Sequence, residues 1–155
     1  MGISAVTEAR YRAARLEDLV DIEAIETTQF AELSYPYFAL RQFFDLHGPH
    51  WIVAELDGAV CGYAMVAFGP EEVAWLMGLG VQKQSQGRGL GSGLMERVLE
   101  LCREERREQV LLTVRPTNQA AYKLYEQTGF RRIDHEERYF GSGQPRDVLV
   151  HRLGR

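Results

Sequence analysis

The segment that most constrains the fold of this 155-residue chain runs from residue 76 to residue 94, with the sequence LMGLGVQKQSQGRGLGSGL. Its first part is short, apolar and bounded by turn residues, which predicts a strand buried on at least one face. Glycines then occupy every second position from 87 to 93, and Leu94, Val98 and Leu101 follow at helical spacing. Because glycine weakens a helix, so dense a run indicates that something lies against the backbone. A strand, a glycine turn and a helix start together predict a binding site for a phosphate group.

Three phosphate-binding glycine motifs compete for this segment. The nucleotide P-loop requires a Gly-Lys-Ser/Thr sequence, which the chain lacks. The dinucleotide fingerprint G-x-G-x-x-G fails because the third glycine falls at Gly91, one position early, and because several predicted strands precede it. The remaining match is QGRGLG at 86–91, which resembles the Q/R-x-x-G-x-G/A pyrophosphate loop of the GNAT N-acetyltransferase superfamily. A loop that is merely rich in glycine is the alternative for this segment taken alone.

The composition excludes several other classes of protein. A net charge of −4 and a pI near 5.6 argue against nucleic acid as a partner, because no basic surplus exists to neutralise phosphates. Cys61 and Cys102 lie in apolar patterns without metal spacing, so we expect reduced core thiols. The sequence has no long apolar run and no signal peptide, which predicts a cytoplasmic protein without a membrane partner. No linker or repeat interrupts residues 1–155, and we expect one domain.

Local patterns predict an alternation of strands and helices along the chain. The hairpin signal is clearest where Asp57-Gly58 joins two β-rich runs. Helices are expected at 16–25, after Pro36, at 89–107 and after a cap at Thr117 or Asn118. Strands are expected at 9–14, 51–56, 59–68, 73–81 and 109–114. The tail supplies the two final strands, the first from 130–133 and 139–140 and the second at 147–153. The order β-αα-βββ-α-β-α-ββ predicts an α/β, or α+β, three-layer fold.

A second motif strengthens the resemblance to the GNAT superfamily. Residues 118–130 read NQAAYKLYEQTGF, which is similar to the superfamily signature N-x-x-A-x-x-L-Y-x-x-x-G-F. The resemblance extends over nearly the whole chain and implies a central mixed sheet of about seven strands flanked by about four helices. Within the superfamily, the segments at 33–36, 75–81 and 138–140, with Asp147, look like those of ribosomal-protein-alanine and other protein N-terminal acetyltransferases.

The resemblance implies acetyl-CoA as co-substrate and no metal. In the family the fourth strand pairs with the pantetheine arm and the glycine loop receives the pyrophosphate. The cofactor-binding residues so implied are Leu79, Gly80, Val81, Gln86, Gly87, Arg88, Gly89, Leu90, Gly91, Ser92, Asn118 and Tyr125. The family also has splayed fourth and fifth strands and often a bulge on the fourth. Gly78 and Gly80 would permit such a bulge, or would simply allow close packing against the sheet.

The resemblance also implies catalytic roles. Tyr125 corresponds to the tyrosine that protonates the departing CoA thiolate, although a merely packed helix residue is the alternative. The chain departs from the family at the general base, because Thr113 and Trp75 occupy the usual positions and neither can accept a proton. Either the base has moved, with Glu72, His135 and Glu136 as candidates, or the amine arrives neutral and a water chain suffices. For His135, which Asp134 and Glu136 flank, an exposed loop residue is the alternative.

The acceptor is expected to be a primary amine, with a protein N-terminus as the first choice. Tyr35, Tyr37 and Tyr139 are the expected substrate-binding residues, because they could frame a peptide channel. A small amine, such as a polyamine, an aminoglycoside or an amino acid, is the alternative acceptor. A non-catalytic acyl-CoA-binding module is the alternative from another class. By analogy with the fold, exposed edges in the last strands would suit a homodimer.

Overall fold

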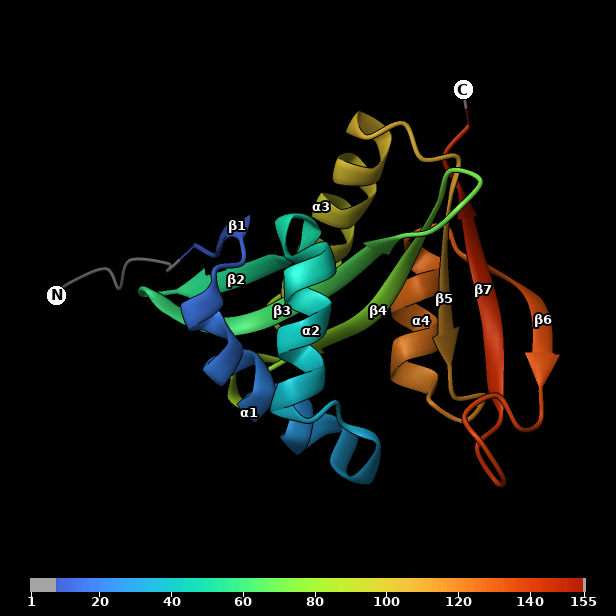
Figure 1. Ribbon diagram of the computed structural model, residues 1–155, viewed down its shortest axis with the longest axis horizontal. Coiled ribbons are helices and arrows are strands. Elements are labelled where there is room, and N and C mark those ends of the chain that lie inside the picture. The colour runs from blue at the N-terminus through green and yellow to red at the C-terminus, as the bar shows by residue number, and fades with distance from the viewer. Residues whose placement is uncertain (1–7, 155) are drawn as a thin grey trace, which may run out of the picture.

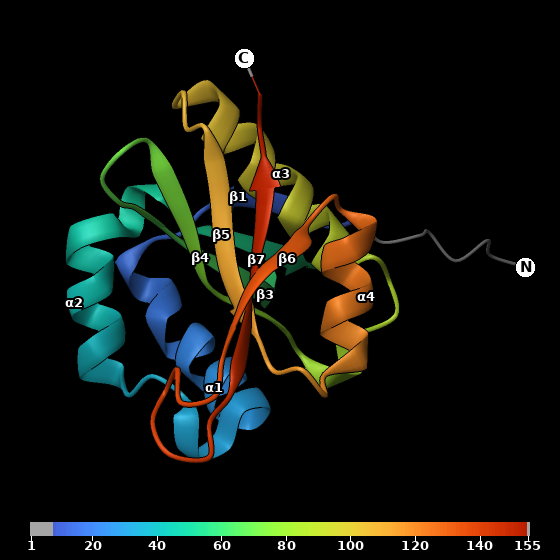
Figure 2. The same ribbon diagram turned by 90° about the vertical axis from the view of Figure 1, so that its right-hand side faces the viewer.

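A seven-stranded mixed sheet lies between two layers of helices in the computed structural model, which describes residues 8–154 (Figures 1 and 2). The sheet order is β1-β2-β3-β4-β5-β7-β6. The strands are β1 Arg10–Ala13, β2 Ile52–Leu56, β3 Ala59–Phe68, β4 Val73–Val81, β5 Gln109–Val114, β6 Arg131–Glu136 and β7 Arg146–Arg152. The helices are α1 Leu19–Phe30, α2 Tyr37–His47, α3 Leu90–Glu104 and α4 Gln119–Gln127. The predicted fold class and element order are confirmed, as are the bounds of β4 and β5.

The predicted elements differ from the observed ones at their ends. Helix α1 begins at Leu19, because Leu16–Asp18 form a 3-10 turn. Asp18 is held in that turn by the Arg12 guanidinium at 2.7 Å and by the Arg15 amide at 2.7 Å. Residues 139–140 lie in the β6–β7 turn, so the expected strand there is wrong. The Gly-Ser-Gly-Gln-Pro sequence that follows keeps this stretch in a turn.

The β2–β3 hairpin forms as the Asp-Gly signal predicts. Asp57 and Gly58 both adopt positive φ angles, 52° and 79°. This is the conformation that a two-residue type I′ turn requires, and it matches the twist of the flanking strands. The hairpin supplies β3, which pairs with β4, the central strand of the sheet.

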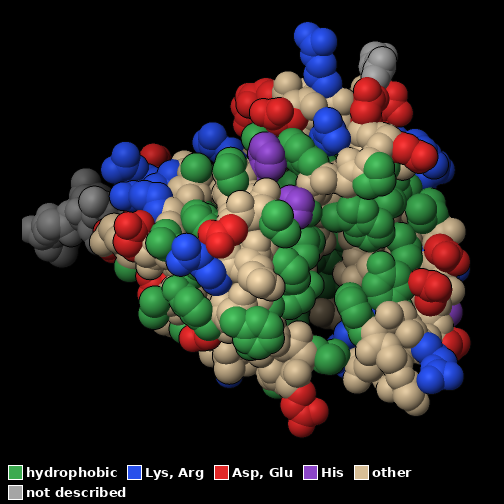
Figure 3. Space-filling model, viewed as in Figure 1, with side chains coloured by type: hydrophobic (Ala, Val, Ile, Leu, Met, Phe, Trp, Pro, Cys, Tyr) green, Lys and Arg blue, Asp and Glu red, His purple; other side chains and the backbone are tan. Residues whose placement is uncertain are grey.

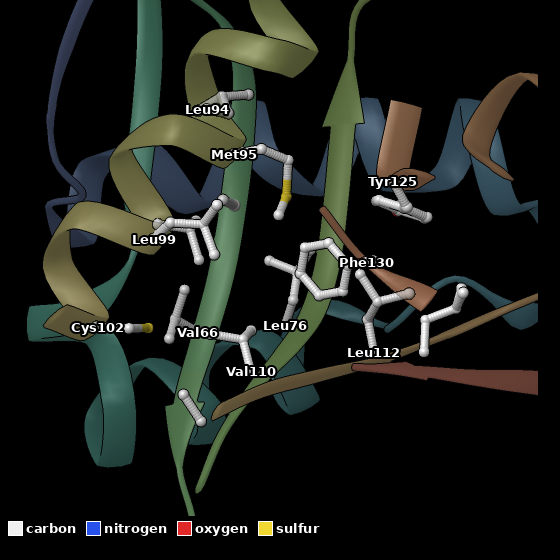
Figure 4. Close-up of a cluster of buried hydrophobic side chains, with 14 of the residues drawn as sticks. Val66, Leu76, Leu94, Met95, Leu99, Cys102, Val110, Leu112, Tyr125 and Phe130 are labelled. Atoms are coloured by element: carbon white, nitrogen blue, oxygen red, sulfur yellow. The ribbon is translucent and has the colours of Figure 1, made fainter. Parts of the chain in front are cut away.

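Each face of the sheet carries its own core. Helices α3 and α4 cover one face through a cluster that includes Leu94, Met95, Leu112 and Phe130 (Figure 4). Helices α1 and α2 cover the other face through residues such as Ile22, Leu40 and Tyr63. Cys61 and Cys102 are buried free thiols, as expected. Among the described residues, no helix is long and apolar enough to cross a bilayer.

Strands β4 and β5 separate soon after they meet. Their parallel pairing joins Val73–Trp75 to Gln109–Leu111 and includes no later residue of either strand. From Leu112 onward β5 pairs only with β7, while β4 continues along β3. The two strands diverge down the view in Figure 1, and the splay expected from the family is present.

Strand β4 also contains a bulge beside this splay. Leu76 pairs with Val66 of β3 and Gly78 pairs with Met65, so Met77 is the extra residue. Met77 packs toward the α1–α2 core, and a Cβ on Gly78 would also lie on that side. A bulge locally re-aims the backbone of its strand, and here it does so where β4 and β5 have already separated.

Candidate active site

The glycine loop has the geometry of an anion site at the start of α3. Gly87 and Gly89 adopt φ angles of 84° and 77°, which glycine tolerates far better than other residues. Gly89 is the N-cap of α3, and no side chain in the described part of the chain caps that helix end. The first-turn amides are thus available to a bound phosphate, which the helix dipole also favours.

The loop also brings α3 close to α4. A Cβ on Gly91 would lie 3.2 Å from Cδ2 of Leu124, so glycine at 91 permits this approach. At the start of the loop, the Gln86 side-chain amide donates to the Val81 carbonyl at 3.1 Å. The loop is therefore tied to the end of β4, and the residues expected to hold pantetheine and pyrophosphate form one continuous segment.

The bulge expected at the β4 glycines is present, whereas the closest packing partners of these glycines are side chains of β3 and not of a helix. A Cβ on Gly78 would lie 2.4 Å from Cε of Met65, and one on Gly80 would lie 2.7 Å from Cε1 of Tyr63. Side chains of β3 thus lie directly across β4, which is the close packing that glycine allows. The bulge at Met77 is present as well, immediately before Gly78.

Tyr125 lies in the hydrophobic core between α4 and the sheet. Its ring makes an edge contact with Phe130, with 6.0 Å between the centroids, and burial raises the pKa of its phenol to about 12. Asn118 caps α4 by accepting a hydrogen bond from the Ala121 amide at 3.1 Å. Of the two expected caps, it is Asn118 that forms, and it sets the start of the helix that carries Tyr125.

Glu72 lies away from the bulge. It occupies the β3–β4 turn with a φ angle of 60°, at the closed end of the β4–β5 cleft. Five residues separate it from Met77, which corresponds to about 16 Å along a strand. The structure does not bring Glu72 to the part of β4 where the strands have separated.

His135 lies in a hydrogen-bonded network on the α4 side of the sheet. Its Nδ1 is 2.5 Å from Oδ1 of Asp147, and its Nε2 is 2.6 Å from Oε1 of Glu137. The buried Asp147 also accepts a hydrogen bond from the Tyr122 hydroxyl of α4. Asp147 pairs with Val114, whose side chain belongs to the α3–α4 core, and this assigns the network to that face. The hydrogen bonds to Asp147 and Glu137 raise the pKa of His135.

Thr113 and Trp75 lie on the opposite, α1–α2 side. In β5, residues Val110, Leu112 and Val114 face the α3–α4 core, so the alternation turns Thr113 the other way. Ala74 and Leu76 of β4 belong to the same core, which likewise turns Trp75 toward α1 and α2. A base acting on this side must come from the elements that cover it.

A buried carboxylate that the sequence patterns did not indicate lies on this side. Glu26 of α1 is 2% exposed, and its Oε1 accepts a hydrogen bond from the Tyr63 hydroxyl at 2.5 Å. Its Oε2 accepts a hydrogen bond from the Tyr35 amide at 2.9 Å. The available signal was spacing, because Glu26 follows Ile22 by four residues and so lies on the helix face that the core residues define.

Two of the three predicted substrate residues lie near each other. Tyr35, in the α1–α2 connection, makes an edge contact with Phe43 at 5.2 Å between centroids. Burial, the Glu26 charge and the Tyr139 phenol all raise the pKa of Tyr35. Figures 1 and 2 place the α1–α2 connection and the β6–β7 turn at the same end of the molecule, where β4 and β5 have separated. Tyr37 is exposed at the start of α2. Figure 3 shows a hollow between these parts of the molecule, bordered by hydrophobic side chains on both sides.

Comparison with known proteins agrees with this geometry. The Acetyltransferase (GNAT) family model matches residues 16–130. An N-alpha-acetyltransferase of Sulfurisphaera tokodaii is 29% identical over 149 residues, covering 88% of this chain and 89% of the relative. Among solved structures, Ard1 from Thermoplasma volcanium has a TM-score of 0.88 at 20% identity, covering 95% of this chain and 99% of that chain. Naa50 from Arabidopsis thaliana, in complex with the bisubstrate analogue CoA-Ac-MVNAL, has a TM-score of 0.78 at 20% identity, covering 92% and 97%.

The chain belongs to the GNAT acetyltransferase family, because the family model spans most of its length. It is an acetyl-CoA-dependent N-acetyltransferase, and acetyl-CoA is its co-substrate. The uncapped start of α3 and the left-handed glycines of the loop fit that co-substrate's pyrophosphate. No group of three or more His, Cys, Asp or Glu residues that could hold a metal ion occurs within residues 8–154.

Proposed function

We propose that this protein acetylates the α-amino group of polypeptide N-termini, with Tyr125 as the general acid. The observation that carries the proposal is the entrance on the α1–α2 side. There the α1–α2 connection, which carries Tyr35, and the β6–β7 turn, which carries Tyr139, lie at the end of the sheet where β4 and β5 have separated (Figures 1 and 2). Two walls from distant parts of the chain, with aromatic side chains, suit an extended peptide that ends at the cleft.

The surface around this entrance supports a peptide acceptor over a polycation. Large apolar side chains are exposed on the α1–α2 connection, the start of α2 and the β6–β7 turn. They are Phe30, Leu33, Tyr37, Phe38 and Phe140. An apolar rim binds peptide side chains by burying them. The name of the Sulfurisphaera relative and the peptide portion of the Naa50 ligand support the same class of acceptor.

The co-substrate is proposed to lie in the cleft between β4 and β5. The backbone of Leu79, Gly80 and Val81 would pair with its pantetheine arm, and the amides from Gly87 to Ser92 would bind its pyrophosphate. Arg88 is exposed in this loop and would contribute charge, while Gln86 positions the loop on β4. The exposed Asn118, at the start of α4, would bound the same cleft.

Tyr125 is proposed to donate a proton to the departing CoA thiolate. Because burial holds the pKa of its phenol at about 12, it remains protonated throughout the pH range of an assay. A thiol has a pKa near 8.5, so the proton transfer requires the nitrogen of the collapsing intermediate to return a proton to the phenol. Donation in the transition state, with immediate replacement, satisfies that requirement.

The experiment that tests the proposal measures CoA release from acetyl-CoA. Peptides with free N-termini, the same peptides with blocked N-termini, and a panel of small amines would be compared. We expect turnover with free N-termini alone. Turnover with small amines alone would overturn the acceptor class, and tight acetyl-CoA binding without turnover on any amine would identify a binding module.

A further inference from the structure

An amine that enters from the α1–α2 side of the sheet requires a proton acceptor there. The two positions at which the family usually carries that base do not supply one in this chain. Thr113 of β5 and Trp75 of β4 both turn toward this side, and neither side chain can accept a proton at neutral pH. The His135 network lies on the α4 face instead. Glu72 lies in the turn at the closed end of the cleft.

Glu26 lies where such a group is needed. It projects from α1 toward β4, and a Cβ built on Gly78 would lie 3.5 Å from its Oε1. Gly78 directly follows the bulge at Met77, in the part of β4 that has separated from β5. The carboxylate is therefore next to the backbone of the bulge, on the side from which an acceptor would approach.

The partners of the carboxylate leave its charge uncompensated. The Tyr63 hydroxyl donates to Oε1 and the Tyr35 amide donates to Oε2, so each oxygen keeps capacity for another donor. Among residues 8–154, no Lys, Arg or His forms an ion pair with Glu26. A buried carboxylate without a cation is costly, and the ammonium form of a primary amine would supply both the missing charge and the missing donors.

We propose that Glu26 is the catalytic base, whose carboxylate takes the proton from the acceptor ammonium beside the β4 bulge. This inference rests on the proposed function, because it requires an amine to enter from the α1–α2 side. Tyr63 is a positioning residue in this scheme, since its hydroxyl holds Oε1 against β4. Tyr35 has the same role through its backbone, and it links the base to the peptide-binding wall.

The proton and electron balance of the reaction is complete with these groups. One N–H bond of the ammonium breaks, its proton moves to a Glu26 oxygen, and the nitrogen keeps the electron pair. That pair forms the bond to the thioester carbonyl carbon, and the C–S bond then breaks with its electrons on sulfur. Tyr125 donates its phenolic proton to the sulfur and regains one from the nitrogen. Glu26 finally releases its proton to solvent.

The electrostatic surroundings raise the proton affinity of the proposed base. Burial raises the pKa of Glu26 above the ordinary carboxyl value, against the opposing effect of the hydrogen bonds from Tyr63 and Tyr35. The titratable residues that face it are Tyr63 from β3 and Tyr35 from the α1–α2 connection. Burial, the Glu26 charge and the hydrogen bond to Glu26 all raise the pKa of Tyr63, so Tyr63 stays protonated and keeps donating to the carboxylate.

The first test compares Glu26→Gln with the wild-type enzyme across pH, using a free N-terminal peptide and acetyl-CoA. Below the amine pKa of about 7.7–8.0, we expect Glu26→Gln to lose about 10²-fold or more in kcat/KM. The deficit is expected to shrink above that pH, because the amine then arrives neutral. Glu23→Gln, on the same helix, is the matched control and is expected to keep the wild-type profile. A deficit that is constant across pH, or full activity of Glu26→Gln, would overturn the proposal.

A second variant covers the case in which Glu26→Gln does not fold. Tyr63→Phe removes the hydrogen bond that lowers the pKa of Glu26. The acidic limb of its kcat/KM profile is expected to move to higher pH while the alkaline plateau remains. An acidic limb that stays in place would show that Glu26 is not the group titrating.

The two proposals fail in different ways. If wild type acetylates only a small amine, the polypeptide acceptor is wrong, and the pH comparison is repeated with that amine to judge Glu26 alone. If peptides are acetylated equally by wild type and Glu26→Gln at every pH, the base is wrong while the acceptor class stands. Absence of turnover on any amine would overturn both.

Discussion

Trp75 of β4 pairs with Leu111 of β5, and they are the last residues that these two parallel strands share. One position later, Leu76 pairs with Val66 of β3, and Leu112 pairs with Leu149 of β7. The backbone edge of β4 beyond Trp75 is therefore not used by β5. Backbone groups left unpaired by the sheet need other partners, and an extended ligand with amide groups can supply them. The bulge at Met77, the Gly78–Glu26 contact and the glycine loop all follow this point along the chain.

Replacement of Tyr125 by phenylalanine tests the proposed acid. We expect Tyr125→Phe to lower kcat by about 10²-fold while acetyl-CoA affinity is unchanged, because the ring still fills the same core position. Steady-state kinetics and a binding titration measure the two effects. Tyr122→Phe on the same helix is the control: it removes the hydrogen bond to Asp147 and should lower stability by about 1–2 kcal/mol without loss of kcat. Equal kcat for the two variants would contradict the role of Tyr125.

Substitution of Gly89 tests the phosphate loop. A Cβ on Gly89 would meet no described atom within 4 Å, but its φ of 77° is strained for alanine by about 1–2 kcal/mol. Gly58, in the β2–β3 turn, has a φ of 79° and equally open surroundings, so Gly58→Ala carries the same strain. We expect both variants to lose similar thermal stability. Only Gly89→Ala should weaken the Kd for acetyl-CoA, by about tenfold, which is 1.4 kcal/mol. An unchanged Kd would remove the loop from the binding site.

Stability should depend on pH through His135 and Asp147. The hydrogen bonds to Asp147 and Glu137 raise the pKa of His135 from its ordinary value of 6.5, so this stabilisation is full below 6.5 and is lost as pH rises through the folded value. Although burial opposes it, hydrogen bonds from Tyr122 and His135 lower the pKa of Asp147 from 3.8, so its contribution is full above 3.8 and is lost in more acidic solution. The difference in Tm between wild type and His135→Gln should be largest between pH 3.8 and pH 6.5, the ordinary pKa values of Asp147 and His135. A gap that grows above pH 8 would refute this assignment.

Glu26 should make wild type less stable as pH rises. Burial raises the pKa of Glu26 in the folded state above its ordinary value of 4.5. Its contribution to stability is therefore full below 4.5 and is lost as pH rises through the folded value. Glu26→Gln cannot ionise, so its Tm relative to wild type should increase across that range in thermal melts. A Tm difference independent of pH would mean that the ordinary and folded pKa values are equal.

Much of the fold could be predicted because its signals are local. The Asp57-Gly58 turn, the cap at Asn118 and the apolar run of β4 each depend on neighbouring residues, and each was found where expected. The glycine loop is equally local, because its spacing and its place between a strand and a helix define the anion geometry. The position of Tyr125 on α4, which bounds the same cleft, followed from the family signature alone.

Neighbouring residues in the sequence could not decide among the candidate bases. His135 could be placed on a face only once the β6–β7 register was known, and that register shifts between Arg132 and Asp134. A slip of one residue exchanges the two faces of a strand, so no pattern within β6 itself decides which way His135 points. Tertiary structure turned it toward α4 and Asp147.

The sequence by itself determined most of the elements, the glycine loop and the family, because these depend on spacing within short segments. Only the tertiary structure decided which carboxylate lies beside the β4 bulge. Glu26 and Tyr63 are 37 residues apart in the chain, and packing of α1 on the sheet brings their side chains to 2.5 Å. The contact depends on the crossing of a helix and a strand, and Gly78 of β4 lies against the same carboxylate. Burial at that crossing, which follows from the packing of the whole α1–α2 layer, also raises the pKa of the carboxyl group.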